Sequence, residues 1–158
     1  MSDKGFSNEL ARALARPDVE ILRRSFQTYY DWTKHRSEET EDDWPDGLDL
    51  WFDDEDADKS LALVALAMAS TDDEAFLILV ACGLLENILS HRPAIDGVPL
   101  PPALLNRIVE EARRTPRFRW MLSAMWTTGM PEDEARLIAE AVGRVSCETD
   151  PLPPRPWA

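Results

Sequence analysis

The sequence predicts an all-α fold, a single-domain multi-helix bundle of about seven helices. Apolar residues recur at helical spacing, as at Val19, Leu22 and Phe26. The two longest apolar runs, 61–69 and 75–85, are rich in Ala, Leu and Met and poor in the β-branched residues that favour strands. Prolines, glycines and capping residues separate these segments. Hairpins stacked as in a helical repeat are one arrangement that this pattern allows.

Pro17 separates the first two predicted helices. Leu10 and Leu14 belong to a short helix that ends before Pro17, because the residue preceding a proline disfavours helix. Pro17 suits the first turn of a second helix, and the basic residues 34–36 at its end complement the helix dipole. We therefore expect a break near Pro17 and a second helix that closes at 34–36.

The two apolar runs predict helices in the middle of the bundle, because they are apolar nearly all round. One helix should end near Ala69. Thr71 and Glu74 have the spacing of a capping box, so the next helix is predicted to begin at Thr71. Arg92-Pro93 ends this hairpin.

Three further helices follow a Pro-rich loop. The first has Leu104, Leu105, Ile108 and Ala112 on one face. The second starts at Pro116, and the third opens at Pro131. The buried residues expected in these last two helices are Phe118, Met121, Leu122, Met125 and Trp126, then Leu137, Ile138, Ala141, Val142 and Val145, with Gly129 as the stop between them.

One helical domain is expected over residues 1–148, followed by a Pro-rich C-terminal tail, 149–158. The tail should be extended and polyproline-like, and disorder is the commonest state of such a tail, although docking in an aromatic groove is an alternative. No apolar run reaches the length of about 20 residues that a membrane span needs, and no secretory signal is evident. We expect a cytoplasmic protein, and 14 Arg against 3 Lys suggest a GC-rich bacterial genome.

The strongest compositional feature is an acidic run inserted between helices at residues 38–58. It holds 12 Asp and Glu and no Lys or Arg, so the rest of the chain sums to −1 of the net −13. Such a run is often no more than a solvated surface. Here it is interleaved with Trp44, Trp51 and Phe52, and aromatic side chains beside carboxylates suit recognition of a cationic protein surface.

These observations favour a non-enzymatic protein that binds and neutralises a basic protein partner, as an immunity protein or inhibitor covers a toxin or nuclease. Direct binding of nucleic acid or an anionic membrane is disfavoured by the acidic balance. The oligomeric state is not specified by the sequence. The predicted partner-binding residues are Trp44, Asp46, Asp49, Trp51, Asp53, Asp54, Glu55 and Asp56.

Two other functions fit the same sequence. In the first, the acidic run mimics DNA and inhibits a nucleic-acid-binding protein. In the second, the protein is a small helical enzyme or scaffold with a ligand groove near Glu86, Asn87 and His91, between the 61–85 hairpin and the 118–126 helix. A buried acid such as Glu86 more often pairs with an arginine or reaches solvent than serves in catalysis.

No catalytic residue, metal ligand set or cofactor motif is predicted. Asp54, Asp56 and Asp58 imitate half of an EF-hand loop, but Lys59 stands where the loop needs Gly and Ala65 where it needs Glu. Loose binding of divalent cations by the run is the alternative. Nucleophile elbows and phosphate-binding glycine loops are absent from the sequence. Cys82, in an apolar helix, is interpreted as a small core residue.

An arginine cluster in the third quarter of the chain is expected to pair with the acidic run. It consists of Arg107, Arg113, Arg114, Arg117 and Arg119. Contact with phosphate is the alternative, which the negative field of the whole molecule disfavours.

Four segments between residues 61 and 130 resemble a small bacterial all-helical family described only as a domain of unknown function. They are 61–64 (LALV), 70–73 (STDD), 81–89 (ACGLLENIL) and 117–126 (RFRWMLSAMW), with Met130 after them. The resemblance implies an all-α fold in which paired helices stack somewhat like a helical repeat. It implies no activity, cofactor or partner.

Overall fold

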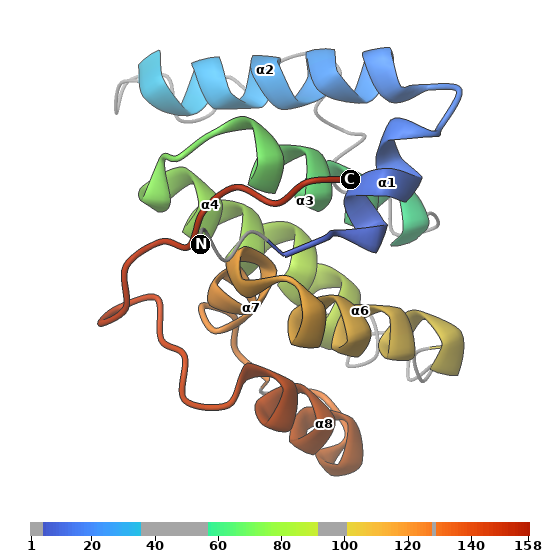
Figure 1. Cartoon of the computed structure of the whole chain (residues 1–158), viewed down its shortest axis with the longest axis vertical. Helices are drawn as coiled ribbons and strands as arrows, with labels where there is room; N and C mark the ends of the chain where they lie inside the picture. The colour runs from blue at the N-terminus through green and yellow to red at the C-terminus, as the bar shows by residue number, and fades with distance from the viewer. Residues whose placement is uncertain (1–4, 36–56, 92–100, 128) are drawn as a thin grey trace.

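The computed structural model describes residues 5–35, 57–91, 101–127 and 129–158, and these residues form an all-α, multi-helix fold (Figure 1). Each of the seven predicted helices has a counterpart. The α-helices are α1 (Asn8–Leu14), α2 (Val19–His35), α3 (Ala57–Ser70), α4 (Glu74–Val80), α6 (Pro102–Arg114), α7 (Pro116–Leu122) and α8 (Glu132–Val142). Two π-helical segments, η3 (Ala81–Leu85) and η4 (Asn87–His91), continue α4.

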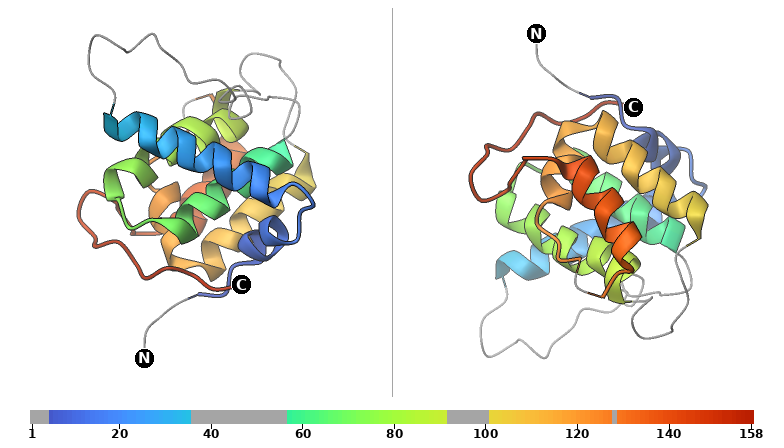
Figure 2. Two further views of the ribbon diagram at one scale, coloured as in Figure 1. Left: turned by 90° about the horizontal axis from the view of Figure 1, so that it is seen from above. Right: turned by 90° about the horizontal axis from the view of Figure 1, so that it is seen from below.

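Helix α3 lies at the centre of the bundle, as its apolar sequence predicts. Every residue from Ser60 to Met68 is buried. The helices α1, α2, α4 and α7 and the segment η3 all contact α3. Figure 2 shows α2 and α8 on opposite sides of the bundle. A helix with apolar residues on all faces is stable only when other elements surround it, and this is the position that α3 takes.

The start of α4 differs from the capping box that the sequence predicts. Helix α4 begins at Glu74, and its N-cap is Asp73, whose Oδ1 accepts a hydrogen bond from the Phe76 N–H at 3.1 Å. Thr71 Oγ1 instead accepts from the Asp73 N–H at 3.1 Å. Both side chains are short oxygen acceptors, and the one directly before the first helical residue takes the N-cap role.

Two expected core positions, Trp126 and Leu137, are wrong, and the first is exposed because helix α7 is shorter than its apolar spacing predicts. The helix ends at Leu122, where the Ser123 hydroxyl donates to the Trp120 carbonyl at 2.6 Å. The next N–H groups bond three residues back, so the chain tightens out of the α-helix and Trp126 turns outward, 73% exposed. Leu137 on α8 is also exposed, at 37%, because α8 packs through Ile138 and Ala141 at the edge of the bundle.

The C-terminal tail packs against the body in an extended conformation, so the expectation of disorder is wrong. The Trp157 N–H donates to the Gly5 carbonyl at 3.3 Å, and the Ser7 N–H donates to the Trp157 carbonyl at 2.9 Å. The Trp157 ring meets Phe6 edge-on at 4.7 Å between centroids. Gly5 allows this close approach, because a Cβ there would lie 2.5 Å from the Arg114 carbonyl oxygen.

Candidate functional site

All eight predicted partner-binding residues, which are Trp44, Asp46, Asp49, Trp51, Asp53, Asp54, Glu55 and Asp56, lie outside the described residues. The structure does describe the two points between which the run is inserted. Helix α2 ends at His35, and α3 begins at Ala57. Asp58, the last acid of the run, belongs to the first turn of α3, where a carboxylate is favoured by the helix dipole. The candidate site is therefore built from the body around Asp58.

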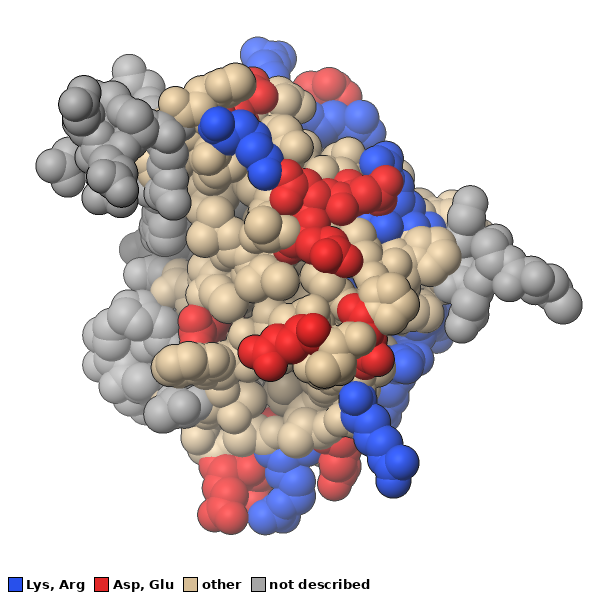
Figure 3. All heavy atoms as spheres, turned by 90° about the vertical axis from the view of Figure 1, so that its left-hand side faces the viewer, with Lys and Arg blue, Asp and Glu red and all other residues tan. Residues whose placement is uncertain are grey.

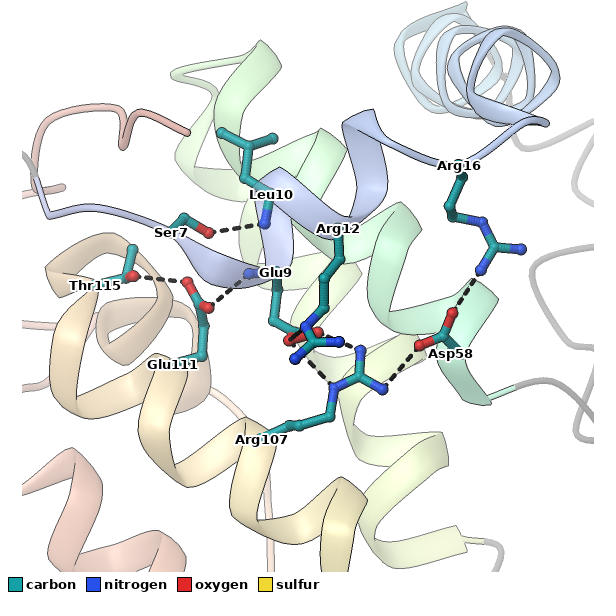
Figure 4. Close-up of polar contacts among 9 residues, drawn as sticks. All are labelled: Ser7, Glu9, Leu10, Arg12, Arg16, Asp58, Arg107, Glu111 and Thr115. Atoms are coloured by element: carbon teal, nitrogen blue, oxygen red, sulfur yellow. Dashed lines mark hydrogen bonds and ion pairs between the residues drawn. The ribbon is translucent and has the colours of Figure 1, made fainter.

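Two arginines from different parts of the fold hold Asp58 (Figure 4). Arg16, between α1 and α2, places Nη1 2.6 Å from Asp58 Oδ2. Arg107, on α6, places Nη1 2.8 Å from Asp58 Oδ1. Arg16 also holds Asp18 at 2.8 Å through Nε. Asp58 thus ties the start of α3 to α6 and to the α1–α2 connection.

Glu9 is the buried carboxylate of this cluster, with 3% of its surface exposed. Arg107 Nη2 donates to Glu9 Oε1 at 2.5 Å, and Arg12 Nε lies 3.5 Å from Glu9 Oε2. A buried carboxylate needs such partners, since burial without them is costly. Hydrogen bonds from Arg107 to Glu9, and then to Asp58, raise the pKa of the Arg107 guanidinium.

A second buried carboxylate, Glu111, caps α1 from outside. Its Oε2 accepts from the Glu9 N–H at 2.9 Å, and its Oε1 accepts from the Thr115 hydroxyl at 2.6 Å. Ser7 Oγ accepts from the Leu10 N–H at 2.9 Å. Two first-turn N–H groups of α1 therefore have acceptors, which a helix of this length requires for stability.

A hollow of about 230 Å³ opens between α1 and α6 beside these groups. Its polar lining holds both signs of charge, and the buried carboxylates in its wall are already bound by the arginines or N–H groups described above. We see in it no nucleophile paired with a base. Its lining residues are Asn8, Glu9, Arg12, Ala103, Asn106, Arg107, Glu110 and Glu111.

The expected pairing of the arginine cluster with the acidic run is correct for Arg107, while other members contact described groups outside the run. Arg107 holds Asp58, as predicted. Arg113 lies 3.5 Å from Glu110, one helical turn away, and Arg119 donates to the backbone carbonyls of Ala112 and Arg113. Helix-end carbonyls and acids one turn away are common partners of guanidinium groups on helices.

Arg117, another member of the cluster, is buried at 3% exposure and joins the tail to the α3–α4 connection. Its Nη1 donates to the Met68 and Thr71 carbonyls at 3.1 and 2.8 Å, and its Nε donates to the Pro153 carbonyl at 2.8 Å. Its Nη2 lies 2.8 Å from Asp72 Oδ1. Burial lowers the pKa of Arg117, against the opposing effect of Asp72.

Asp72 also binds Arg155 of the tail, at 2.9 and 3.1 Å. Hydrogen bonds from Arg155 and then from Arg117 lower the pKa of Asp72 to about 2. Because the folded pKa lies below the unfolded value of about 3.9, the ionised carboxylate stabilises the fold above about pH 4. That contribution is lost as the pH falls from about 4 towards 2.

We expect the melting temperature of the wild type to fall more steeply between pH 5 and pH 2.5 than that of Asp72→Asn. The asparagine cannot ionise, so the variant lacks the stabilisation at pH 5 and has less to lose. Thermal unfolding of both proteins across this range measures the difference, with Asp133→Asn, an exposed change on α8, as the control. Parallel curves for the wild type and Asp72→Asn would contradict this role.

The end of α2 is fastened on the same side of the molecule. Lys34 forms an ion pair with Asp73, and its Nζ lies 5.5 Å from the centre of the Tyr30 ring. The Tyr30 hydroxyl donates to Asp73 Oδ2 at 3.3 Å. The ion pair with Lys34 lowers the pKa of Asp73. Figure 3 shows acidic side chains across the middle of this face, with Lys and Arg side chains towards its margins.

The proposed groove at Glu86, Asn87 and His91 stays a prediction. Glu86 and Asn87 are half-buried where η3 meets η4. The structure does not describe the side chain of His91. Cys82 is half-buried, which makes it less enclosed than the core residue that we expected. Among the described residues, no group of three or more His, Cys, Asp or Glu is placed to hold a metal ion.

Sequence reasoning missed Glu9, Arg16 and Glu111 as members of the charged cluster. The spacing of Glu9 and Arg12 at i and i+3 was the available signal for an ion pair on α1. No feature of the sequence near Glu111 indicates that it binds the Glu9 N–H, because that bond joins α6 to α1.

No helix of the described residues is long and apolar enough to cross a membrane.

The fold and the charged cluster define an all-α multi-helix protein with a near-neutral body and one acidic insertion. The chain belongs to a family of unknown function (DUF6869), whose model matches residues 33–144. That span covers the acidic run and the helices from α3 to α8, whereas α1, most of α2 and the tail lie outside it. No curated protein and no solved structure matches the chain.

Proposed function

We propose that this chain is a non-enzymatic interaction protein that binds a basic protein partner through the acidic, aromatic-containing run at 38–58. The observation that carries the proposal is the separation of charge: 12 acids without a single Lys or Arg, beside a body that sums to −1. A carboxylate field of this kind accelerates encounter with a cationic surface, and neighbouring Trp and Phe rings supply contact area that can be desolvated.

Ion pairs within the body support this proposal. Arg16, Lys34, Arg107, Arg117 and Arg155 each hold a carboxylate outside residues 38–56. The described body therefore balances much of its own charge internally. The acids of the run are then the groups with most charge to offer to a partner, and binding occludes the partner's surface sterically and electrostatically without any reaction.

We expect the quadruple variant Asp53→Asn, Asp54→Asn, Glu55→Gln, Asp56→Asn to bind the partner at least about tenfold more weakly, mainly through slower association. The partner is captured on the wild-type protein from its source organism and identified by mass spectrometry. Affinity and association rate are then measured against salt concentration. The wild type should lose affinity steeply with salt and the variant should lose less, because salt screens exposed charges.

The matched control removes four acids from the body instead: Glu20→Gln, Asp133→Asn, Glu140→Gln and Glu148→Gln, all of them exposed. It has the same net charge as the first variant and should retain wild-type affinity. If both variants bind equally well, the run is a solvated surface and the proposal is wrong. Competition by duplex DNA for the captured partner would identify the DNA-mimic form of the same inhibition.

A further inference from the structure

Both free cysteines of the chain bind the connection between α7 and α8. Cys82 Sγ lies 3.5 Å from the Ala124 carbonyl oxygen, to which it donates. The Cys147 N–H donates to Ser123 Oγ at 2.9 Å. Cys82 and Cys147 are the two cysteines of the chain, and both are half-buried. Residues far apart in sequence are thus anchored to consecutive residues, Ser123 and Ala124.

Hydrogen bonds and packing contacts fix the segments that carry the two cysteines. Cys147 lies in a turn closed by two bonds of 2.8 Å, from the Asp150 N–H to the Ser146 carbonyl and from the Ser146 N–H to Asp150 Oδ2. The indole N–H of Trp120 donates to the Asp150 carbonyl at 3.0 Å, which fixes the turn to the core. Cys82 belongs to η3, which contacts α3 and α7. The chain around each cysteine is therefore fixed to the body.

The surroundings of the Cys82 thiol lower its reactivity as a nucleophile. Burial raises the pKa of the Cys82 thiol, and the nearby charges of Glu86 and Cys147 raise it further. The thiolate is the reactive form, so Cys82 is a poor first nucleophile.

We propose that Cys82 and Cys147 are a reversible thiol-modification site that forms an intramolecular disulfide between η3 and the turn after α8. The oxidant class is a low-molecular-weight disulfide such as oxidised glutathione. The Cys147 thiolate attacks one sulfur of the reagent and releases the first thiolate. Cys82 then gives its proton to solvent and attacks the Cys147 sulfur, which releases the second.

The step is balanced, since two protein thiols lose two electrons and two protons and one reagent disulfide becomes two thiols. The second attack is intramolecular, with an effective concentration that exceeds that of free reagent. The product closes a loop that contains α6, α7 and α8, and closing a loop of this size lowers the entropy of the unfolded chain.

The test treats the reduced, folded full-length chain with oxidised glutathione and alkylates the remaining thiols. We expect a monomer with no free thiol, one peptide pair joined through Cys82 and Cys147, and a melting temperature raised by about 5–10 °C that dithiothreitol reverses. Stable glutathione adducts, disulfide-linked dimers or two unreacted thiols in the folded protein would each overturn the proposal.

Two variants control for position. Cys147→Ser keeps the backbone N–H that binds Ser123 and should show neither the internal link nor the rise in melting temperature. The double change Ser146→Cys, Cys147→Ser moves the thiol by one residue on the same turn. Its internal disulfide should form at least about tenfold more slowly, because disulfide geometry is specific. Equal rates would show that the pairing does not depend on the position described here.

Discussion

Replacing Arg117 with methionine is expected to lower the free energy of unfolding by about 3–5 kcal/mol, because three carbonyls lose their donor and each buried group left unsatisfied costs about 1–3 kcal/mol. The Arg117 guanidinium is 3% exposed and donates to the carbonyls of Met68, Thr71 and Pro153. Methionine fills much of the space but offers no donor. These carbonyls, at the end of α3, in the next connection and in the tail, would then lose their donor together.

Chemical denaturation of the wild type and Arg117→Met measures this loss. Arg113→Met on the exposed side of α6 is the matched control, since Arg113 forms a solvent-exposed pair with Glu110. Such pairs contribute about 1 kcal/mol at most. A loss below about 1 kcal/mol for Arg117→Met would show that the buried guanidinium is dispensable.

Trp120→Ala is expected to destabilise the fold by about 3–5 kcal/mol, as large-to-small changes of buried aromatic residues do. Trp120 is fully buried on α7, and its indole N–H donates to the Asp150 carbonyl at 3.0 Å. Removing the ring leaves a cavity in the core and releases the turn that carries Cys147. The melting temperature should fall with the free energy of unfolding.

Trp126→Ala makes the same chemical change six residues later, where the side chain is 73% exposed, and it serves as the control. We expect its effect to stay below about 1 kcal/mol, since substitutions at exposed positions usually have small effects. Comparable losses for the two tryptophans would contradict the placement of α7 described above.

The helices could be predicted because their apolar spacing and the prolines at their boundaries are local properties of the sequence. Helix α3 shows this best, since apolar residues on every face specify both a helix and a central position. The early end of α7 was not predictable from spacing, because Met125 and Trp126 continue the apolar pattern after Ser123 has turned the chain. The apolar spacing indicates which residues prefer burial, whereas local hydrogen bonds determine where the helix ends.

The charged cluster around Asp58 could be predicted from the sequence only in part. Asp58 was recognised as part of an acidic run, and Arg107 was expected to pair with that run. The bond from Arg107 to Glu9 and the bond from the Glu9 N–H to Glu111 gave no such signal, because they join helices that meet only in the folded chain. Long-range pairing of this kind depends on the topology of the bundle, which a single sequence specifies only indirectly.

The contact between Trp157 and the segment 5–7 brings the first and last described residues to one point on the surface. The covalent chain between them is thereby closed into a ring by two backbone hydrogen bonds and one aromatic pair. A short peptide joining the two ends would add little strain, and it would remove conformational freedom from the unfolded chain alone. Chain that enters at Gly5 and chain that leaves after Trp157 therefore do so from the same place on the surface.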